Sequence, residues 1–423
     1  MKVYLRTFGC RANQYDSERV RAMVEAAGGT IVAEPDEADA AVFNSCAVTS
    51  AAEADLRQGV RRAARARPAL RSVVMGCAAA LDAQPRLART GLSLSALPSV
   101  QSVVPGADLE AVAAALGLSP GASAAVPAGG QSGARALLRI QDGCDEHCTF
   151  CATTLARGAH RSRTVEALVE EARALAAHHP EIVLTGVHIG SYGRDVGTSL
   201  GALVRRLARD VPGVRLRLTS VEATEVDAEL RELLTGEPAR VAPYLHAPLQ
   251  SGSDSVLKRM GRHWYRAEDY ARAVERLVRD TPVFGLGADV IAGFPDETAA
   301  DHVATVQLIE RLPFTSLHVF PWSPRPGTAA ERLPSRVAAA LVSERAAELR
   351  ELSARKAAAY RAARVGGTAD VVVVTGAPQR EGITGDYLTV RVADEMQARG
   401  SRFQAILDDG EPHLVARRLA GGA

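Results

Sequence analysis

The amino-acid sequence predicts a multidomain α/β protein with an N-terminal parallel α/β domain, a central full or partial (β/α) barrel and a small C-terminal all-β domain. Three observations predict this class. Apolar strands alternate with amphipathic helices over the first hundred or so residues and again from Arg135, a Gly/Ser/Ala/Pro-rich stretch separates the two runs, and the last sixty or so residues change to period-two patterns. We place the boundaries at residues 1–105, a linker at 106–134, then 135–360 and 361–423.

The composition is that of a globular protein able to bury a large core, with 47% hydrophobic and 23% charged residues in a chain of 423. The net charge of +1 gives no indication of a nucleic-acid partner. No apolar run approaches the ~20 residues of a membrane span, and the start "MKVYLRTFGC" lacks the apolar region of a secretory signal. With only six cysteines, we expect reduced thiols, a cytoplasmic location and no membrane association.

The N-terminal domain is predicted from three strands, "KVYLRTF", "ADAAVFNS" and "RSVVMG", with helices between them. One helix is expected near residues 16–27, ending at Gly28-Gly29, and another over about 50–67, stopping at Pro68. Strands that alternate with helices in this way indicate a parallel sheet with covering helices.

A cysteine follows each of these three strands: Cys10, Cys46 and Cys77. The carboxyl ends of parallel strands lie on one edge of a sheet, where open α/β folds bind ligands, so the three thiols can converge in space. The alternative is that each is a small buried core residue. Because all three strands end in this way, we favour a shared site.

The central domain is predicted to continue the strand–helix alternation. Residues 105–134 hold one short helical pattern followed by linker-like chain. A long helical pattern covers 336–363. After it, "ADVVVV", "DYLTVRV" and "RFQAIL", separated by Gly- and Asp-bearing turns, predict a small barrel or sandwich. Six barrel strands are expected, at 135–141, 181–185, 214–219, 243–247, 284–291 and 315–320.

The stretch "GCDEHCTFC" (143–151) places three more cysteines, Cys144-x3-Cys148-x2-Cys151, just past the first barrel strand. A closed zinc site uses four ligands, and a cubane iron–sulfur cluster that only transfers electrons takes four thiolates. Three thiolates leave one iron without a protein ligand, which is where a metal site can meet its substrate. We therefore interpret the motif as a cubane cluster with an open corner. A structural zinc loop that borrows a distant histidine is the alternative.

Polar and glycine-rich turns follow the other barrel strands. "LTGVHIGSYG" (184–193) holds Thr185 and Gly186, "TSVEA" holds Glu222, "APLQSGSD" holds Gln250, and "GADVIAGFPDE" (287–297) is glycine-rich. For any one of them, an ordinary capping or loop role explains the residue equally well. Together, at successive strand ends, they favour a bound cofactor.

The cysteine spacing resembles that of the radical S-adenosylmethionine enzymes, and with both cysteine trios the whole chain resembles the methylthiotransferases. The resemblance implies two [4Fe-4S] clusters, an auxiliary one on the first trio and a radical one on the second, with S-adenosyl-L-methionine on the open iron of the latter. It also implies an electron donor such as flavodoxin or ferredoxin, and a C-terminal TRAM domain that binds substrate. The implied cofactor-binding residues are Phe150, Thr185, Gly186, Glu222, Gln250, Asp289 and Gly293.

The stretches "TFGCRANQYDSE", "EIVLTGVHIGSYG" and "PFTSLHVFPWSPRPGTAA" look most like the threonylcarbamoyl-adenosine branch of that family. The resemblance implies insertion of a methylthio group at C2 of that nucleoside, beside the anticodon of tRNA. Other branches act on isopentenylated adenosine or on a ribosomal-protein aspartate, and a non-catalytic iron–sulfur RNA-binding protein is a further alternative. No catalytic side chain beyond the clusters is expected, because an unactivated C–H bond offers no acidic proton to a base.

The sequence departs from the family pattern in two places. After Cys151 it reads "ATTLARG", where an apolar pair and Pro-Tyr usually precede "ARG", so packing beside the radical cluster is in doubt. Asp296 replaces a usual glycine, a change that we expect to be mild because Asp tolerates left-handed backbone.

The terminal domain is also less basic than an RNA-binding module should be. From Asp370 onward, six arginines face eight acidic residues, a net charge of −2. Phosphate contacts are instead expected from Arg57, Arg61 and Arg65, spaced four apart on one helix, although a solvated surface stripe explains them equally well.

Overall fold

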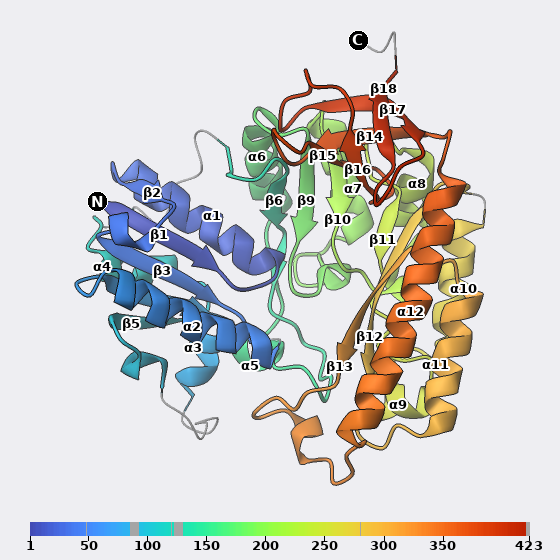
Figure 1. Cartoon of the computed structure of the whole chain (residues 1–423), viewed down its shortest axis with the longest axis horizontal. Coiled ribbons are helices and arrows are strands. Elements are labelled where there is room, and N and C mark those ends of the chain that lie inside the picture. Colours follow the sequence, from blue (N-terminus) through green and yellow to red (C-terminus); the bar gives the residue numbers. More distant parts are fainter. Residues whose placement is uncertain (48, 85–92, 120, 122–129, 280, 420–423) are drawn as a thin grey trace. The chain divides into compact units, whose positions relative to one another are not determined.

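The computed structural model describes the chain apart from residues 48, 85–92, 120, 122–129, 280 and 420–423 (Figure 1). Part of the predicted linker at 106–134 therefore lies outside the described residues. Internal contacts divide the chain into two compact units. The N-terminal unit comprises Met1–Gly129, Gln141–Arg161 and Ser323–Arg332, and the barrel unit comprises Gly130–Ile140, Ser162–Trp322 and Leu333–Ala423. The four-part division that we infer from the sequence stays a prediction.

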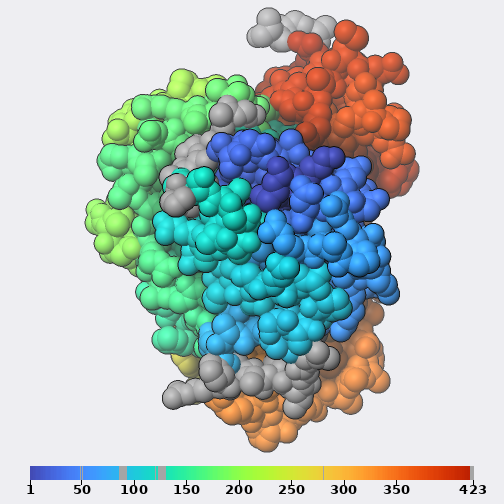
Figure 2. Space-filling view, turned by 90° about the vertical axis from the view of Figure 1, so that its left-hand side faces the viewer, coloured from blue at the N-terminus to red at the C-terminus, as the bar shows by residue number. Residues whose placement is uncertain are grey.

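The N-terminal unit is built on a five-stranded parallel sheet in the order β2-β1-β3-β4-β5. Its helices cover both faces (Figure 1), and its blue to cyan residues form a continuous surface in Figure 2. The three predicted strands and two predicted helices are present, α4 corresponds to the short helical pattern expected within 105–134, and β2, β5 and α3 are additional. The bounds are β1 (Lys2–Thr7), α1 (Arg11–Ala26), β2 (Thr30–Val32), β3 (Ala40–Ser45), α2 (Ser50–Ala66), β4 (Arg71–Gly76), α3 (Cys77–Asp82), β5 (Val100–Pro105) and α4 (Leu109–Leu116).

Alternating side chains of the sheet form two hydrophobic cores. On β3, Val42 packs with residues of α1 and α4, whereas Phe43 packs with residues of α2 on the other face. This alternation is the period-two geometry of a strand buried on both sides. Helix α4 lies within the predicted linker, yet Val112 and Leu116 belong to the first of these cores.

The second cysteine trio lies on a loop between a short strand and a short helix. β7 (Gln141–Asp142) precedes the cysteine loop, α5 (Thr153–Arg157) follows it, and β8 (Arg161–Ser162) pairs with β7.

The barrel unit contains all six predicted barrel strands. Its two parallel sheets have the orders β10-β9-β6 and β11-β12-β13, and isolated bridges from Leu216 to Val241 and from Ser220 to His246 join them into a partial barrel. The strands are β6 (Ala136–Arg139), β9 (Glu181–Thr185), β10 (Arg215–Leu218), β11 (Tyr244–His246), β12 (Gly285–Ala292) and β13 (Ser316–Pro321). The helices are α6 (Val165–Ala176), α7 (Leu200–Asp210), α8 (Ala228–Gly236), α9 (Asp254–Arg259), α10 (Ala267–Val278), α11 (Ala299–Arg311) and α12 (Ala339–Ala363).

The last part of the chain forms a closed β-barrel in the order β14-β15-β16-β18-β17, which confirms the predicted all-β class. The sequence patterns locate three of these five strands. Their bounds are β14 (Thr368–Val373), β15 (Glu381–Thr384), β16 (Thr389–Val392), β17 (Arg402–Asp408) and β18 (Val415–Arg418).

A buried charge cluster attaches this β-barrel to the larger one. The Glu181 carboxylate accepts hydrogen bonds from Arg215 Nε at 2.6 Å and from Arg217 Nε at 2.8 Å, and all three side chains are fully buried. Arg217 also donates to the carbonyl oxygens of Thr384 at 2.9 Å and Gly385 at 3.0 Å. Because Glu181 and Arg215 begin β9 and β10, the β-barrel is bound at the amino ends of the barrel strands.

Candidate functional site

The first cysteine trio meets at one edge of the N-terminal sheet. Cys10 is the N-cap residue of α1, Cys46 follows β3, and Cys77 begins α3 directly after β4. The strands β1, β3 and β4 are neighbours in the sheet. Burial raises the pKa of the Cys77 thiol to about 11; Arg157 opposes this rise, whereas Cys10 and Cys46 lie close enough to add to it. The three cysteines therefore lie at the same edge of the sheet, and their role as one ligand set stays a prediction.

Two asparagines, which the sequence analysis did not single out, fix the backbone around this trio. Asn13 Nδ2 donates to Asn44 Oδ1 at 2.8 Å, and Asn44 Nδ2 donates back to the carbonyl oxygen of Asn13 at 2.8 Å. Both side chains are fully buried. Cys10 Sγ lies 3.3 Å from Asn13 Oδ1, so the pair couples the start of α1 to β3 beside the cysteines.

Gly76, which precedes Cys77, has a backbone that only glycine adopts without strain. Its φ is +96°, and a Cβ there would lie 2.5 Å from the Ser45 carbonyl oxygen. We expect Gly76→Ala to lower the free energy of unfolding by about 2–5 kcal/mol, because strain and overpacking add. Urea unfolding measures the loss. The matched control is Gly28→Ala, where φ is +74° but nothing lies within 4 Å of the new Cβ, and equal losses in the two variants would contradict the packing argument.

The second cysteine trio sits on a loop shaped by its own backbone. The Cys144 amide donates to the Gly158 carbonyl oxygen at 3.1 Å, and the Cys151 amide donates to the Cys148 carbonyl oxygen at 3.1 Å. Backbone amides also point at sulfur, from Glu146 to Cys144 Sγ at 3.4 Å and from Thr153 to Cys151 Sγ at 3.3 Å. Donors of this kind are typical of the surroundings of iron-bound thiolates.

The departure "ATTLARG" forms the short helix α5. Thr153, Thr154 and Leu155 are partly buried, and the Leu155 carbonyl oxygen accepts from Gln84 Nε2 at 2.7 Å. Ala156 packs against Cys77 and Ala80 in a small apolar cluster. The unusual residues thus begin a helix whose end packs beside the first trio.

Arg157, the last residue of α5, connects the two trios. Its Nε lies 3.4 Å from Cys77 Sγ, its Nη2 lies 2.9 Å from Asp16 Oδ2, and its Nη1 lies 3.3 Å from Asp142 Oδ1. Only 2% of its side chain is exposed. No sequence pattern singles out Arg157, Asp16 or Asp142, because nothing local distinguishes a buried arginine from the many exposed ones.

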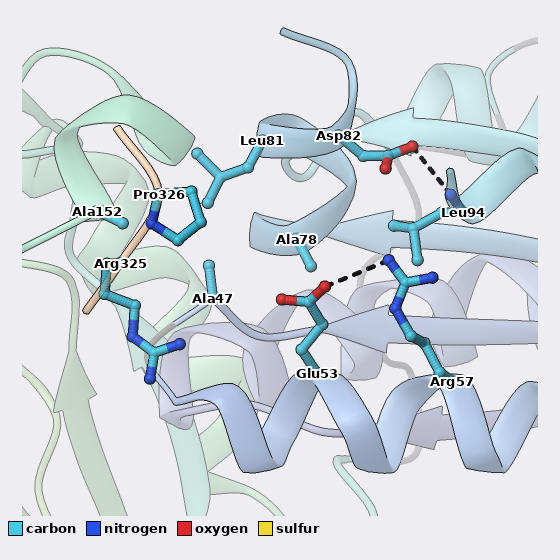
Figure 3. Close-up of a pocket in the computed structure, with 10 residues that line it drawn as sticks. All are labelled: Ala47, Glu53, Arg57, Ala78, Leu81, Asp82, Leu94, Ala152, Arg325 and Pro326. Carbon is cyan, nitrogen blue, oxygen red and sulfur yellow. Dashed lines mark hydrogen bonds and ion pairs between the residues drawn. The ribbon is translucent and has the colours of Figure 1, made fainter. Parts of the chain in front are cut away.

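A small pocket lies beside both trios within the N-terminal unit (Figure 3). It measures about 30 Å³, enough for a water molecule. Arg57 extends from α2 into this region and pairs with Glu53 at 3.3 Å, whereas Arg61 and Arg65 are exposed. The predicted arginine stripe is therefore only partly a surface stripe, and its RNA contact stays a prediction.

The pocket includes the residue after Cys46, the residue after Cys77 and the residue after Cys151, namely Ala47, Ala78 and Ala152.

Most of the predicted cofactor-binding residues of the barrel unit lie at or just beyond the carboxyl ends of its strands, whereas Asp289 lies within β12. Thr185 ends β9 and is buried, and Gly186 follows it. Gln250 has φ +63°, and Gly293 has φ +75° with its amide donating to Glu297 Oε2 at 2.9 Å. Asp296 has φ +62°, the left-handed backbone that we expected it to tolerate. Phe150 belongs instead to the cysteine loop of the N-terminal unit and is partly buried.

Glu222 is buried beyond β10 and forms an ion pair with Arg262. Burial raises the pKa of its carboxyl group, an effect that Arg262 opposes. Its Oε2 atom is buried and has no hydrogen-bond partner among the residues that the structure describes. An unpaired buried acceptor of this kind is suited to a ligand that carries a donor.

Asp289 lies between two histidines on neighbouring strands. Its Oδ1 is 3.0 Å from His246 Nε2 and 3.2 Å from His318 Nδ1, and these hydrogen bonds hold the pKa of Asp289 far below its usual value although burial opposes them. Within the described ranges, no other trio of His, Cys, Asp or Glu ligand atoms lies wholly within 4.8 Å. Which metal group the two cysteine trios hold stays a prediction.

Comparison with known proteins identifies two family segments. Residues 2–93 match the group described as "Uncharacterized protein family UPF0004", and residues 138–309 match the radical SAM superfamily. The chain is 35% identical to the threonylcarbamoyladenosine tRNA methylthiotransferase MtaB of Thermotoga maritima, over 85% of this chain and 83% of that protein. It is 34% identical to the tRNA-2-methylthio-N(6)-dimethylallyladenosine synthase of Erythrobacter litoralis, over 87% and 85%.

The chain belongs to the radical S-adenosylmethionine methylthiotransferases. Its fold is also similar to that of the radical S-adenosylmethionine methyltransferase TsrM from Kitasatospora setae, with a TM-score of 0.56 and 16% identity over 78% of this chain and 77% of that one. The methylthiotransferase family is an enzyme family that uses iron–sulfur and S-adenosylmethionine chemistry. None of the described helices combines the length and apolar character that crossing a membrane requires.

The residues of this methylthiotransferase fit such cofactors. One N–H group is directed at each of the sulfurs of Cys77, Cys144 and Cys151, which suits thiolates rather than thiols. The free Glu222 oxygen offers an acceptor at a barrel strand end, where a cofactor bound to the barrel would carry amino and hydroxyl donors.

Proposed function

We propose that this methylthiotransferase holds two iron–sulfur clusters and inserts a methylthio group at C2 of threonylcarbamoyladenosine beside the anticodon of tRNA. The observation that carries the two-cluster arrangement is the pair of three-cysteine sets within one compact unit, both without a fourth cysteine among the six in the chain. Cys10, Cys46 and Cys77 would hold the auxiliary cluster, and Cys144, Cys148 and Cys151 the radical cluster.

The protein's own residues supply binding and placement. When bound, the radical cluster and S-adenosylmethionine supply the radical that a C–H bond without an acidic proton requires. Glu222 would accept a hydrogen bond from the cofactor, and Thr185, Gly186, Gln250, Asp289, Gly293 and Phe150 would complete its surroundings. A flavodoxin- or ferredoxin-type donor would supply the electron, and the target base must leave its stack to reach the site.

The choice of threonylcarbamoyladenosine rests on the quoted stretches and on the polarity of the barrel. The threonylcarbamoyl group carries a carboxylate and a hydroxyl, whereas a dimethylallyl group is apolar. His246, Asp289 and His318 lie on three adjacent strands, and 66% of the His318 side chain is exposed. Such a polar group of side chains suits a polar substituent better than an apolar one.

The substrate is tested by nucleoside analysis. Reconstituted enzyme, S-adenosylmethionine and a reductant are incubated with anticodon stem-loops that carry either threonylcarbamoyladenosine or isopentenyladenosine. We expect the methylthio product from the first RNA only, as measured by mass spectrometry of the digested nucleosides. The Cys144→Ala/Cys148→Ala/Cys151→Ala variant is the blank. Product from the isopentenyl RNA alone would refute this substrate but not the family.

A further inference from the structure

Arg157 is bound by partners on three separate elements of the N-terminal unit. Asp16 comes from α1, Cys77 from α3 and Asp142 from β7. Asp16 and Arg157 are each only 2% exposed in their side chains, and the Asp142 side chain is 19% exposed. A guanidinium has a planar fork of N–H donors and can serve three such partners at once, which an ammonium cannot do with the same geometry.

The contact with sulfur distinguishes this arrangement from an ordinary buried ion pair. Two carboxylates already pair with the guanidinium, and its Nε is still directed at Cys77 Sγ. An N–H donor and a fixed positive charge beside a thiolate ligand stabilise the more negative, reduced form of an iron–sulfur cluster and so raise its reduction potential. The same cation offsets the cost of a thiolate at this buried position.

We propose that Arg157 is a positioning residue that orients the Cys77 sulfur toward the auxiliary cluster and raises that cluster's reduction potential. Asp142 immediately precedes the cysteine loop at Gly143–Cys151, so the same guanidinium also fixes that loop against α3. One guanidinium therefore has a partner in the first cysteine set, Cys77, and another directly before the second, Asp142. This inference rests on the proposed two-cluster function.

The test uses the full chain with the second trio removed, Cys144→Ala/Cys148→Ala/Cys151→Ala, so that the auxiliary cluster is observed alone. Anaerobic reconstitution should give about four irons per chain in this parent protein. Arg157→Gln and Arg157→Lys are added separately, and Arg62→Gln, an exposed arginine on α2, is the matched control. The measurements are iron content, the reduction potential and the electron paramagnetic resonance spectrum of the reduced cluster.

We expect a more negative potential in Arg157→Gln, a smaller shift in Arg157→Lys, an altered spectrum in both, and no change in Arg62→Gln. A loaded Arg157→Gln cluster with the parent potential and spectrum would overturn the proposal. If Arg157→Gln does not fold, Arg157→Lys is the deciding variant, because its ammonium cannot reproduce all three contacts. An unchanged spectrum and an unchanged reduction potential in Arg157→Lys would then overturn the proposal. A parent without any cluster would instead refute the two-cluster function, and this inference with it.

Discussion

Replacing Glu181 by glutamine is expected to lower the free energy of unfolding of the barrel unit by about 3–5 kcal/mol, because it leaves the buried Arg217 without its carboxylate partner and leaves Arg215 with Asp370 alone. Arg215 and Arg217 are fully buried around this carboxylate. Both also donate to carbonyl oxygens of the terminal β-barrel, Arg215 to that of Asp370 at 2.7 Å and Arg217 to that of Thr384 at 2.9 Å. Urea unfolding followed by circular dichroism measures the loss, and limited proteolysis should show early release of the β-barrel.

The pH dependence of this effect has a definite sign. Burial alone would raise the pKa of Glu181, but Arg215 and Arg217 outweigh burial and hold the pKa well below its usual value. A carboxyl group with a lowered pKa contributes stability above its unfolded pKa of about 4.3, and that contribution is lost only as the pH falls toward the folded pKa. The difference between wild type and Glu181→Gln should therefore be constant from pH 6 to pH 8 (roughly the neutral range) and shrink below about pH 4.

The matched control is Glu268→Gln, which removes the same charge from an exposed pair with Arg311. Solvent screens such pairs, so little change is expected. A Glu181→Gln variant as stable as Glu268→Gln, or a difference that disappears near pH 6, would show that the buried cluster does not hold the β-barrel in place.

The fold is largely predictable from the sequence because its main signals are local. The six barrel strands and the strands before Cys10, Cys46 and Cys77 are apolar runs between helical patterns, and each lies where the pattern predicts. Helix α4 shows a limit of local signals, which predict the helix but not the core into which it packs. It lies next to a Gly/Ser/Ala/Pro-rich stretch and was assigned to the linker with it, although Val112 and Leu116 contribute to the N-terminal core.

The site is less predictable, because its supporting residues act through contacts that are distant in sequence. Arg157 lies 141 residues from Asp16 and 80 from Cys77, and nothing in "LARG" reveals that its side chain is buried. The net charge of −2 counted from the sequence of the terminal domain is likewise a poor guide to the charge of its surface. Two of its acidic residues, Asp370 and Asp386, pair with Arg215 and Arg364, which precede the counted segment, so the formal charge does not describe the surface.

Substitutions in the two cysteine trios should separate the two halves of the reaction, cleavage of S-adenosylmethionine and transfer of the methylthio group. Cys148→Ala is expected to abolish both S-adenosylmethionine cleavage and methylthiolation, because the radical cluster loses one of its three thiolate ligands. Cys46→Ala is expected to retain cleavage of S-adenosylmethionine, measured as 5′-deoxyadenosine by chromatography, because the radical cluster keeps its ligands. The amount of methylthiolated nucleoside should fall at least about 100-fold, because the auxiliary cluster is lost. Iron content should fall from about eight to about four per chain in either variant.

This separation has a structural control, because Cys46 is 6% exposed and its replacement by alanine removes little volume. The melting temperature of iron-free Cys46→Ala should stay within a few degrees of that of the iron-free wild type, roughly what a loss of 1 kcal/mol gives in a chain of this size. With the fold intact and deoxyadenosine still formed, a missing methylthio product can only reflect the auxiliary site. Methylthiolation at the wild-type rate in Cys46→Ala would mean that the first trio is not a ligand set, and that Cys10, Cys46 and Cys77 meet at the sheet edge as core residues.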